Sequence, residues 1–423
     1  MAVPLVLLVV LGATWWAWRL RPDVQDAGPA VIVLPLEAVA GGEDGRLLAN
    51  GLTADLIADL ARFDGVRVFT GRIGIGGRVE VPPAAGDLVY IVAGTVAREA
   101  ARIHVTARLT EPASEQILWS RSYDRTLSAG DIFGTEGVLT AAIVRELAQS
   151  YGVIAADAAK RLDRSQPTTM FAYECVQRAF AFRRSFASEG YAPVRACLEE
   201  SVARDPGYAA AWAMLAFVHL DAARFGMVPA EDQPAELQAG LGAARHAVEL
   251  APDSVTALQS LAALRYATGE IEEAERVLRR AIALNPNDPE SLAQLGWRLA
   301  VHGRWGEGRD LLQEAIDRTV SVPDWYYLVL AVSLYLANDL EPARAAAEHG
   351  KSTCCGLGHV FLAMTEAALG HSEAARAALD EALRQAPLLG RDPTRYWANF
   401  QVAPEVVARF NAGLAKAGFR LPP

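Results

Sequence analysis

The first pattern that could do chemistry is a run of glycines after a short apolar stretch. The segment Gly71-Arg-Ile-Gly-Ile-Gly-Gly follows residues 66–70 and has the composition of a phosphate-binding loop. Such a loop needs a helix directly after it, because the free N–H groups at the helix start hold the phosphate. The chain instead continues into residues 79–83, which contain two prolines, and no Gly-Lys-Ser/Thr sequence occurs. We expect a surface turn here and no nucleotide or other cofactor.

Residues that commonly bind metals or catalyse hydrolysis are scattered along the chain. The seven histidines have neither the His-Glu-x-x-His spacing of zinc proteases nor a nearby pair of carboxylates. Cys354 and Cys355 are adjacent, but they lack the second cysteine pair that a zinc site needs. No Gly-x-Ser-x-Gly sequence or paired-carboxylate signature stands out either. The sequence therefore predicts no metal site and no catalytic residues, and we expect the protein not to be an enzyme.

Composition narrows the function classes further. The 423 residues are enough for two or more domains, and the net charge of −10 comes without any concentrated run of basic residues. Phosphate backbones need a local excess of Lys and Arg, so we expect no nucleic-acid partner. We also expect no small-molecule substrate. Binding of another protein is the class of function that remains.

A 34-residue repeat organises the second half of the chain. The prolines Pro252 and Pro286 are one period apart, and the apolar and small residues between them recur one period later. The recurring residues are Leu258, Leu261, Ala262, Ala274, Leu278 and Ala281, matched by Leu292, Leu295, Gly296, Leu312 and Ala315. Small residues let two helices approach closely, and a proline just past the second helix ends it. The pattern predicts two helices per period.

This pattern resembles the tetratricopeptide repeat, and it also fits around Pro206 and before Pro387. A single helix pair cannot bury its apolar face, so the resemblance implies a stacked array of five to six repeats over residues 168–387. In this family the inner face of the first helix of each pair lines a groove for partners. The residues at those positions are Phe217, Gln259, Tyr266, Trp297, Trp325 and Tyr335.

The predicted groove is aromatic and nearly uncharged. It lacks the Lys, Arg and Asn clamp with which chaperone-binding members hold a C-terminal carboxylate, so such a ligand is not expected. Two outcomes stay open for the aromatic residues: they anchor a protein or peptide partner, or they stack against the next repeat.

Cys175 and Cys197 fall on the two helices of the first repeat. If these helices pack antiparallel, the sulfur atoms come within reach of a disulfide bond in an oxidising compartment. The alternative is a pair of small buried apolar residues with free thiols. Both interpretations stay open at the level of sequence.

Residues 2–18 carry no charge and end in Trp15, Trp16 and Trp18 before Arg19 and Arg21. At 1.5 Å per residue they would span about 26 Å as a helix, which is the short end of the range for a membrane crossing. A cleaved signal peptide is the alternative, but a basic leading region and a small-residue cleavage site are missing. Orientation stays open: the two arginines alone favour a cytoplasmic C-terminal part, and a cytoplasmic leader before residue 1 would reverse that assignment.

The region between these two parts alternates helix and strand patterns. Strands are predicted at 31–36, 66–70, 88–96, 102–109 and 117–123, and helices at 46–62 and 138–147. Four segments of this region resemble the TolB-like (FlgO-like) domain. They are Val31-Ile-Val-Leu-Pro-Leu, Asn50-Gly-Leu-Thr-Ala-Asp-Leu, Phe63-Asp-Gly-Val-Arg-Val and Leu118-Trp-Ser-Arg-Ser-Tyr-Asp-Arg. The resemblance implies a domain that sits between a membrane helix and tetratricopeptide repeats, as in class III adenylate cyclases and winged-helix regulators of bacteria. The Gly-rich residues 71–81 depart from that family.

The predicted fold class is therefore mixed: a transmembrane helix, a small α/β domain and an all-α repeat solenoid. The boundaries are 1–21 for the transmembrane helix, 22–29 for a linker, 30–155 for the TolB-like domain, 168–387 for the repeats and 388–423 for a capping helical region. The expected function is a non-enzymatic, membrane-anchored scaffold or sensor in a bacterial inner membrane, with a single pass and a periplasmic soluble part. The alternative is the sensory C-terminal part of a signalling protein whose adenylate cyclase or winged-helix output domain is missing or encoded upstream.

Overall fold

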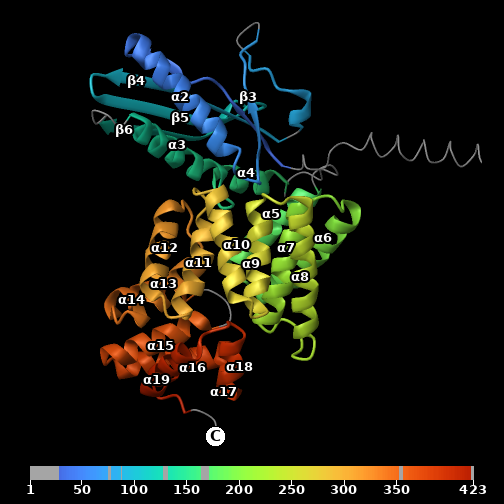
Figure 1. Cartoon of the computed structure of the whole chain (residues 1–423), viewed down its shortest axis with the longest axis vertical. Coiled ribbons are helices and arrows are strands. Elements are labelled where there is room, and N and C mark those ends of the chain that lie inside the picture. The colour runs from blue at the N-terminus through green and yellow to red at the C-terminus, as the bar shows by residue number, and fades with distance from the viewer. Residues whose placement is uncertain are drawn as a thin grey trace, which may run out of the picture.

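The structure is a computed structural model that describes residues 28–74, 78–86, 88–126, 132–162, 171–351 and 356–420. A sheet domain comes first, the helix pairs follow beneath it in Figure 1, and a smaller group of helices lies at the opposite end. The predicted membrane helix, residues 2–18, and most of the predicted linker lie outside the described residues, as do Cys354 and Cys355.

The sheet domain is built around a buried central strand. Its strands are β1 (Ala30–Val33), β2 (Glu37–Ala40), β3 (Arg67–Thr70), β4 (Val89–Glu99), β5 (Arg102–Glu111) and β6 (Gln116–Thr126). The strand order is β3-β1-β4-β5-β6, and β2 also pairs with β4. Strand β1 runs parallel to both neighbours and is buried on both faces, which explains its unbroken apolar sequence. The later strands are antiparallel, and β5 alternates between buried and exposed residues as predicted.

Two long helices cover one face of this sheet, and a third joins the domain to the repeats. They are α2 (Gly42–Leu60), α3 (Ile132–Ala148) and α4 (Val153–Leu162), and a short 3-10 turn, η2, spans Pro83–Ala85. Helix α4 was not predicted, nor was β2. The Tyr90 hydroxyl donates to Asp157 at 2.9 Å, and Arg161 pairs with Glu111 at 3.0 Å, so α4 is bonded to the sheet. The domain therefore extends to Leu162, beyond the predicted boundary at 155.

The repeats form six consecutive helix pairs among the described residues. They are α5 (Phe171–Ser185) with α6 (Tyr191–Arg204), α7 (Ala209–Arg224) with α8 (Gln233–Leu250), α9 (Val255–Ala267) with α10 (Ile271–Leu284), α11 (Pro289–Val301) with α12 (Trp305–Arg318), α13 (Asp324–Leu336) with α14 (Leu340–Gly350), and α15 (Leu357–Leu369) with α16 (Ser372–Gln385). A short 3-10 turn, η3 (Ser188–Gly190), precedes α6.

Small residues set the spacing within a pair. A Cβ added to Gly308 on α12 would lie 2.6 Å from the carbonyl oxygen of Gly296 on α11, so only glycine allows this contact. Ala262, Ala274 and Ala281 are fully buried where α9 meets α10, as the repeat pattern predicts. The helix starts are fixed by capping side chains. Ser254 accepts a hydrogen bond from a backbone N–H at the start of α9, and Asp288 does the same at the start of α11.

The C-terminal helices turn back across the array. They are α17 (Pro387–Arg391), α18 (Pro393–Ala398) and α19 (Pro404–Lys416), and α19 packs on α15. These helices occupy most of residues 388–423, for which a capping helical region is predicted. Sequence gave no sign, however, that the loop after α18 reaches the second and third pairs: Gln401 donates to the Ala267 carbonyl at 3.1 Å, and Asn399 lies 3.5 Å from the Arg224 carbonyl.

One helical stretch among the described residues, Thr135–Arg161, combines the length and hydropathy of a membrane span. It comprises α3 and α4, and 56% of its most apolar window is buried inside the protein. A core helix of a globular domain has these same properties, and this stretch lies under the sheet.

Candidate functional site

The first helix of every pair faces the inside of the array and lines one pocket. Its lining side chains come from α5, α7, α9, α11, α13 and α15, or from the residues just after them. The space not filled by protein atoms, including the open mouth, is about 660 Å³. The part of this space that the centre of a water-sized molecule can reach is about 80 Å³, several times what one water molecule needs. The array therefore has one hollow site on the face where the sequence placed a groove.

Three of the six predicted partner residues line this pocket. Phe217 is fully buried on its wall, while Trp297 and Trp325 are partly exposed. The Trp297 ring meets the ring of Phe400 edge-on, at 6.4 Å between centroids. Because Phe400 belongs to the loop after α18, the C-terminal part of the chain lies against a side chain that lines the pocket.

The other three predicted residues are engaged in internal contacts instead. The Gln259 amide donates to Asp288 at 2.6 Å and to Ser291 at 2.8 Å. The Tyr266 hydroxyl lies 3.0 Å from the Gln401 carbonyl oxygen, and Tyr335 packs against the ring of Phe410. Tyr266 and Tyr335 thus pack inside the array, which is one of the two outcomes that the sequence left open for the aromatic residues.

The pocket is not nearly uncharged, which corrects the sequence prediction. Three arginines line it, Arg183, Arg224 and Arg298, and no carboxylate is among the lining side chains. Each guanidinium lies over an aromatic ring: Arg183 over Phe217 at 3.8 Å, with Arg224 over Phe225 and Arg298 over Tyr266 at 4.4 and 5.0 Å.

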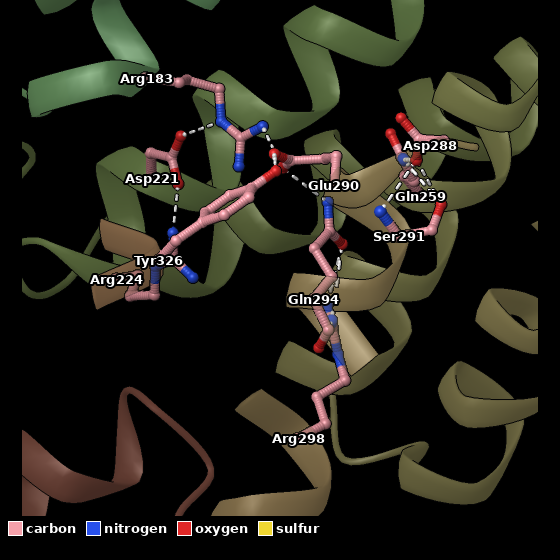
Figure 2. Close-up of polar contacts among 10 residues, drawn as sticks. All are labelled: Arg183, Asp221, Arg224, Gln259, Asp288, Glu290, Ser291, Gln294, Arg298 and Tyr326. Atoms are coloured by element: carbon pink, nitrogen blue, oxygen red, sulfur yellow. Dashed lines mark hydrogen bonds and ion pairs between the residues drawn. The ribbon is translucent and has the colours of Figure 1, made fainter. Parts of the chain in front are cut away.

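Arg183 and Arg224 are paired with acidic side chains that are not among the lining residues (Figure 2). The Arg183 Nε donates to Asp221 at 3.1 Å, and its Nη1 lies 3.8 Å from Glu290. Arg224 donates to the other oxygen of Asp221 at 2.7 Å. Burial alone would lower the pKa of Arg183, but Asp221 and Glu290 outweigh it and raise that pKa. Arg183 is therefore held in place as a cation, and Arg224 is held by the same acid, Asp221.

Arg298 has no such partner. Its side chain is buried, and its Nη1 donates to the backbone carbonyl of Gln294 one turn earlier at 2.6 Å. No carboxylate of the described chain lies within ion-pairing distance, and its Nε has no hydrogen-bond partner there. Burial lowers the pKa of Arg298 to about 10, so the side chain stays charged at neutral pH.

Sequence reasoning missed the three arginines, although one of them left a signal. Arg298 stands one 34-residue period after Leu264 and one before Val332, both buried apolar residues. A charge at a position that the repeat fills with apolar side chains is the anomaly that would have identified it.

Cys175 on α5 and Cys197 on α6 are brought together. Their Cα atoms lie 5.4 Å apart and the structure joins the sulfur atoms in a disulfide. Both residues are buried in the first helix pair. Neither cysteine lines the pocket.

A second hollow lies where the sheet domain meets the repeats. Asp64 accepts from the Ser254 hydroxyl at 2.7 Å and from the Thr256 N–H at 3.1 Å, and burial raises its pKa. Asp288 lines the same hollow, caps α11, and has its pKa raised by burial to about 7. The Asp64 contacts fix the sheet domain to the third pair.

No group of three His, Cys, Asp or Glu side chains within the described ranges could hold a metal ion. The Gly-rich segment is described except for residues 75–77, and an isolated bridge joins Ile73 to Val79.

Comparison with known proteins identifies the repeat. The chain matches the family described as "Tetratricopeptide repeat" over residues 255–297. A protein of Rhizobium meliloti (strain 1021) named "Putative adenylate cyclase 3" is 27% identical over 204 residues, which are 47% of this chain and 34% of that protein. The matched stretch thus spans about a third of that relative.

Solved structures resemble parts of the chain at low identity. The structure of pilF from Pseudomonas aeruginosa is 16% identical, covers 55% of this chain and 96% of its own, and has a TM-score of 0.36. The structure of a human IFIT1 dimer with m7Gppp-AAAA is 14% identical and covers 64% of this chain and 65% of its own, with a TM-score of 0.45.

Proposed function

We propose that this tetratricopeptide repeat protein is a non-enzymatic scaffold that binds a protein partner on the inner face of its repeats. The observation that carries the proposal is the partial exposure of Trp297 and Trp325 at the mouth of the inner pocket. Tryptophan side chains in a concave, mostly apolar setting are frequent anchors of protein interfaces. The other predicted groove residues are engaged within the fold, so these two rings define the surface that a partner would meet.

A pull-down from a membrane extract of the native host tests this surface. Trp297→Ala combined with Trp325→Ala should reduce the captured partner at least tenfold, because the anchoring area is lost. Trp212→Ala combined with Trp305→Ala is the matched control, since these partly buried rings do not line the pocket. Equal capture by the parent and the Trp297/Trp325 variant would rule the inner face out.

We further propose that residues 2–18 anchor the chain in the inner membrane and that the soluble part lies in the periplasm. The uncharged sequence of that stretch and the Cys175–Cys197 disulfide support this placement. Cells treated with a thiol-blocking reagent before lysis should yield Cys175 and Cys197 unmodified unless reductant is added first. Recovery of both cysteines in blocked form without reductant would contradict a periplasmic location.

A second candidate function is the sensory part of a signalling protein. The 27% identity to the Rhizobium meliloti protein, of which the match covers only 34%, favours this alternative. A blot of a C-terminally tagged copy at its own chromosomal locus separates the two candidates. A band near 45 kDa would support the free-standing scaffold, and a band larger by a domain would support the signalling protein.

A further inference from the structure

The inner pocket holds more positive charge than the surrounding side chains neutralise. Arg183 and Arg224 share Asp221, and Arg183 also faces Glu290. These two cations and two anions balance. Arg298 makes no ion pair among the described residues, and Glu290 acts on it only from beyond ion-pairing distance, although the Arg298 side chain is 93% buried.

An unbalanced buried cation is costly for a fold. Transfer of a charge from water into the protein interior carries a large penalty unless a counterion and hydrogen bonds compensate it. The Arg298 guanidinium donates to the backbone carbonyl of Gln294. The side-chain oxygen of Gln294 is 3.5 Å from the guanidinium, and the Arg298 Nε has no hydrogen-bond partner. An anion entering the pocket would supply what the fold lacks at this position.

The rest of the pocket indicates what such an anion is attached to. Trp297 and Trp325 offer two indole rings, and Leu328 and Val329 add apolar wall. The loop after α18 narrows the mouth, because Phe400 lies against both Phe225 and Trp297. A compact aromatic or branched body fits this setting better than an extended chain.

We propose that the inner pocket binds a free small organic acid, whose carboxylate meets Arg298 and whose apolar body lies between Trp297 and Trp325. Arg224, whose Nε is also without a partner, borders the same space and would add to the positive potential. This ligand site shares Trp297 and Trp325 with the proposed protein-binding surface, but it is tested without a protein partner and stands even if that surface captures none.

Thermal unfolding of the full chain in detergent tests the proposal with phenylacetate as the probe and phenylacetamide as its neutral counterpart. Phenylacetate at about 10 mM should raise the Tm of the parent by about 3 °C, since it binds only the folded state. Phenylacetamide should leave the Tm unchanged. Equal shifts from both compounds, or none from either, would overturn the carboxylate site.

The variant Arg298→Met tests whether Arg298 is the residue that binds the carboxylate. The variant should lose the phenylacetate shift while its ligand-free Tm stays the same or rises, because an uncompensated buried charge is replaced by an apolar side chain. Arg376→Met, on the exposed side of α16, is the control and should keep the shift. Retention of the shift by Arg298→Met would overturn the assignment.

Two further measurements keep the test decisive. If Arg298→Met does not fold, Arg298→Lys keeps the charge but loses the planar fork, and its Kd for phenylacetate by calorimetry should rise at least tenfold. A tetrapeptide that ends in Phe, compared with its C-terminal amide, examines the other source of a carboxylate. Binding of the free peptide tenfold tighter than phenylacetate would assign the pocket to a chain terminus and overturn the small-acid assignment.

Discussion

Asp288 is the residue through which pH should act on stability. It is buried, it caps α11, and burial raises its pKa to about 7 although Ser291 donates to it twice. Between about pH 4 and pH 7 this carboxyl is therefore protonated in the folded protein and ionised in the unfolded chain. Because the folded state binds more protons there, the free energy of unfolding falls as pH rises through that window. We predict that Asp288→Asn makes the protein more stable than the parent at pH 8 and nearly equal to it at pH 5.

The difference between pH 5 and pH 8 should be roughly 3 kcal/mol, at about 1.4 kcal/mol per pH unit between pH 5 and the folded-state pKa of about 7. Urea denaturation at half-unit pH steps measures it, and Asp380→Asn on the exposed side of α16 is the control. A parent and an Asp288→Asn variant with parallel pH profiles would show that Asp288 is ionised in the folded state.

A second residue-scale prediction concerns the Cys175–Cys197 disulfide. Its sulfur atoms close a loop of 22 residues, and in the chain-entropy model such a loop contributes about 3 kcal/mol by restricting the unfolded state. Reductant should lower the free energy of unfolding of the parent by this amount. A variant with both cysteines replaced by serine should start from the lower value and show no response, whereas a response to reductant in that variant would point to other thiols.

Residue roles could be predicted from sequence only where they follow the repeat. The positions of Trp297 and Trp325 on the inner face follow from the repeat spacing, and the closeness of Cys175 and Cys197 follows from the pairing of α5 with α6. The ion pair between Arg183 and Glu290 spans 107 positions from the first pair to the fourth. It depends on how tightly the array curves, and no local pattern encodes that curvature.

At the scale of elements, α11 and α12 show how close two helices of a pair must come. Gly308 and Gly306 lie on the same helix, but a Cβ at Gly308 would meet the Gly296 carbonyl at 2.6 Å, whereas a Cβ at Gly306 would meet nothing within 4 Å. We predict that Gly308→Ala destabilises the protein by about 2 kcal/mol through overpacking. Gly306→Ala should stabilise it by about 0.5–1 kcal/mol through helix propensity.

Thermal and urea unfolding of the two variants provide the comparison, and each serves as the control for the other. The same sign for both substitutions would mean that α11 and α12 are not in contact at Gly308.

Element types were largely predictable because their periodicity is local. The five predicted strands and the helix at 138–147 all appear, with ends shifted by a few residues. Strand β2 was missed because Glu37–Ala40 is mostly exposed and carries no alternation, and α4 was missed because its apolar residues serve the junction between domains. Tertiary packing, within the sheet for β2 and at the junction with the repeats for α4, selects these two elements rather than propensity.

At the scale of the whole molecule, the least predictable feature is the return of the C-terminal segment onto the array. Repeat periodicity predicts that each helix pair stacks on the next one along the chain. It does not predict a contact between residues as far apart in sequence as 266 and 401. Yet the Tyr266 hydroxyl lies 3.0 Å from the Gln401 carbonyl, and the Ala403 N–H donates to the Val301 carbonyl at 3.1 Å. These contacts hold Phe400 beside the pocket mouth.

Tyr266→Phe should therefore release this segment without disturbing the helix pairs. The ring that packs below Arg298 is kept, and only the hydroxyl is lost, which contacts the carbonyls of Phe400 and Gln401 and lies 3.1 Å from His302 Nε2. We predict at least tenfold faster hydrogen exchange of the amides at 399–403, and a free energy of unfolding lowered by about 1 kcal/mol.

Tyr326→Phe is the matched control for this release. It also removes a buried hydroxyl, one that donates to Glu290 at 3.0 Å, but at a site away from the loop after α18. Its amides at 399–403 should exchange at the parent rate. Because Phe400 borders the mouth, Tyr266→Phe should also speed the entry and exit of phenylacetate while Arg298 is unchanged. Unaltered exchange at 399–403 would mean that the packing of α19 on α15, and not the Tyr266 hydroxyl, holds the segment in place.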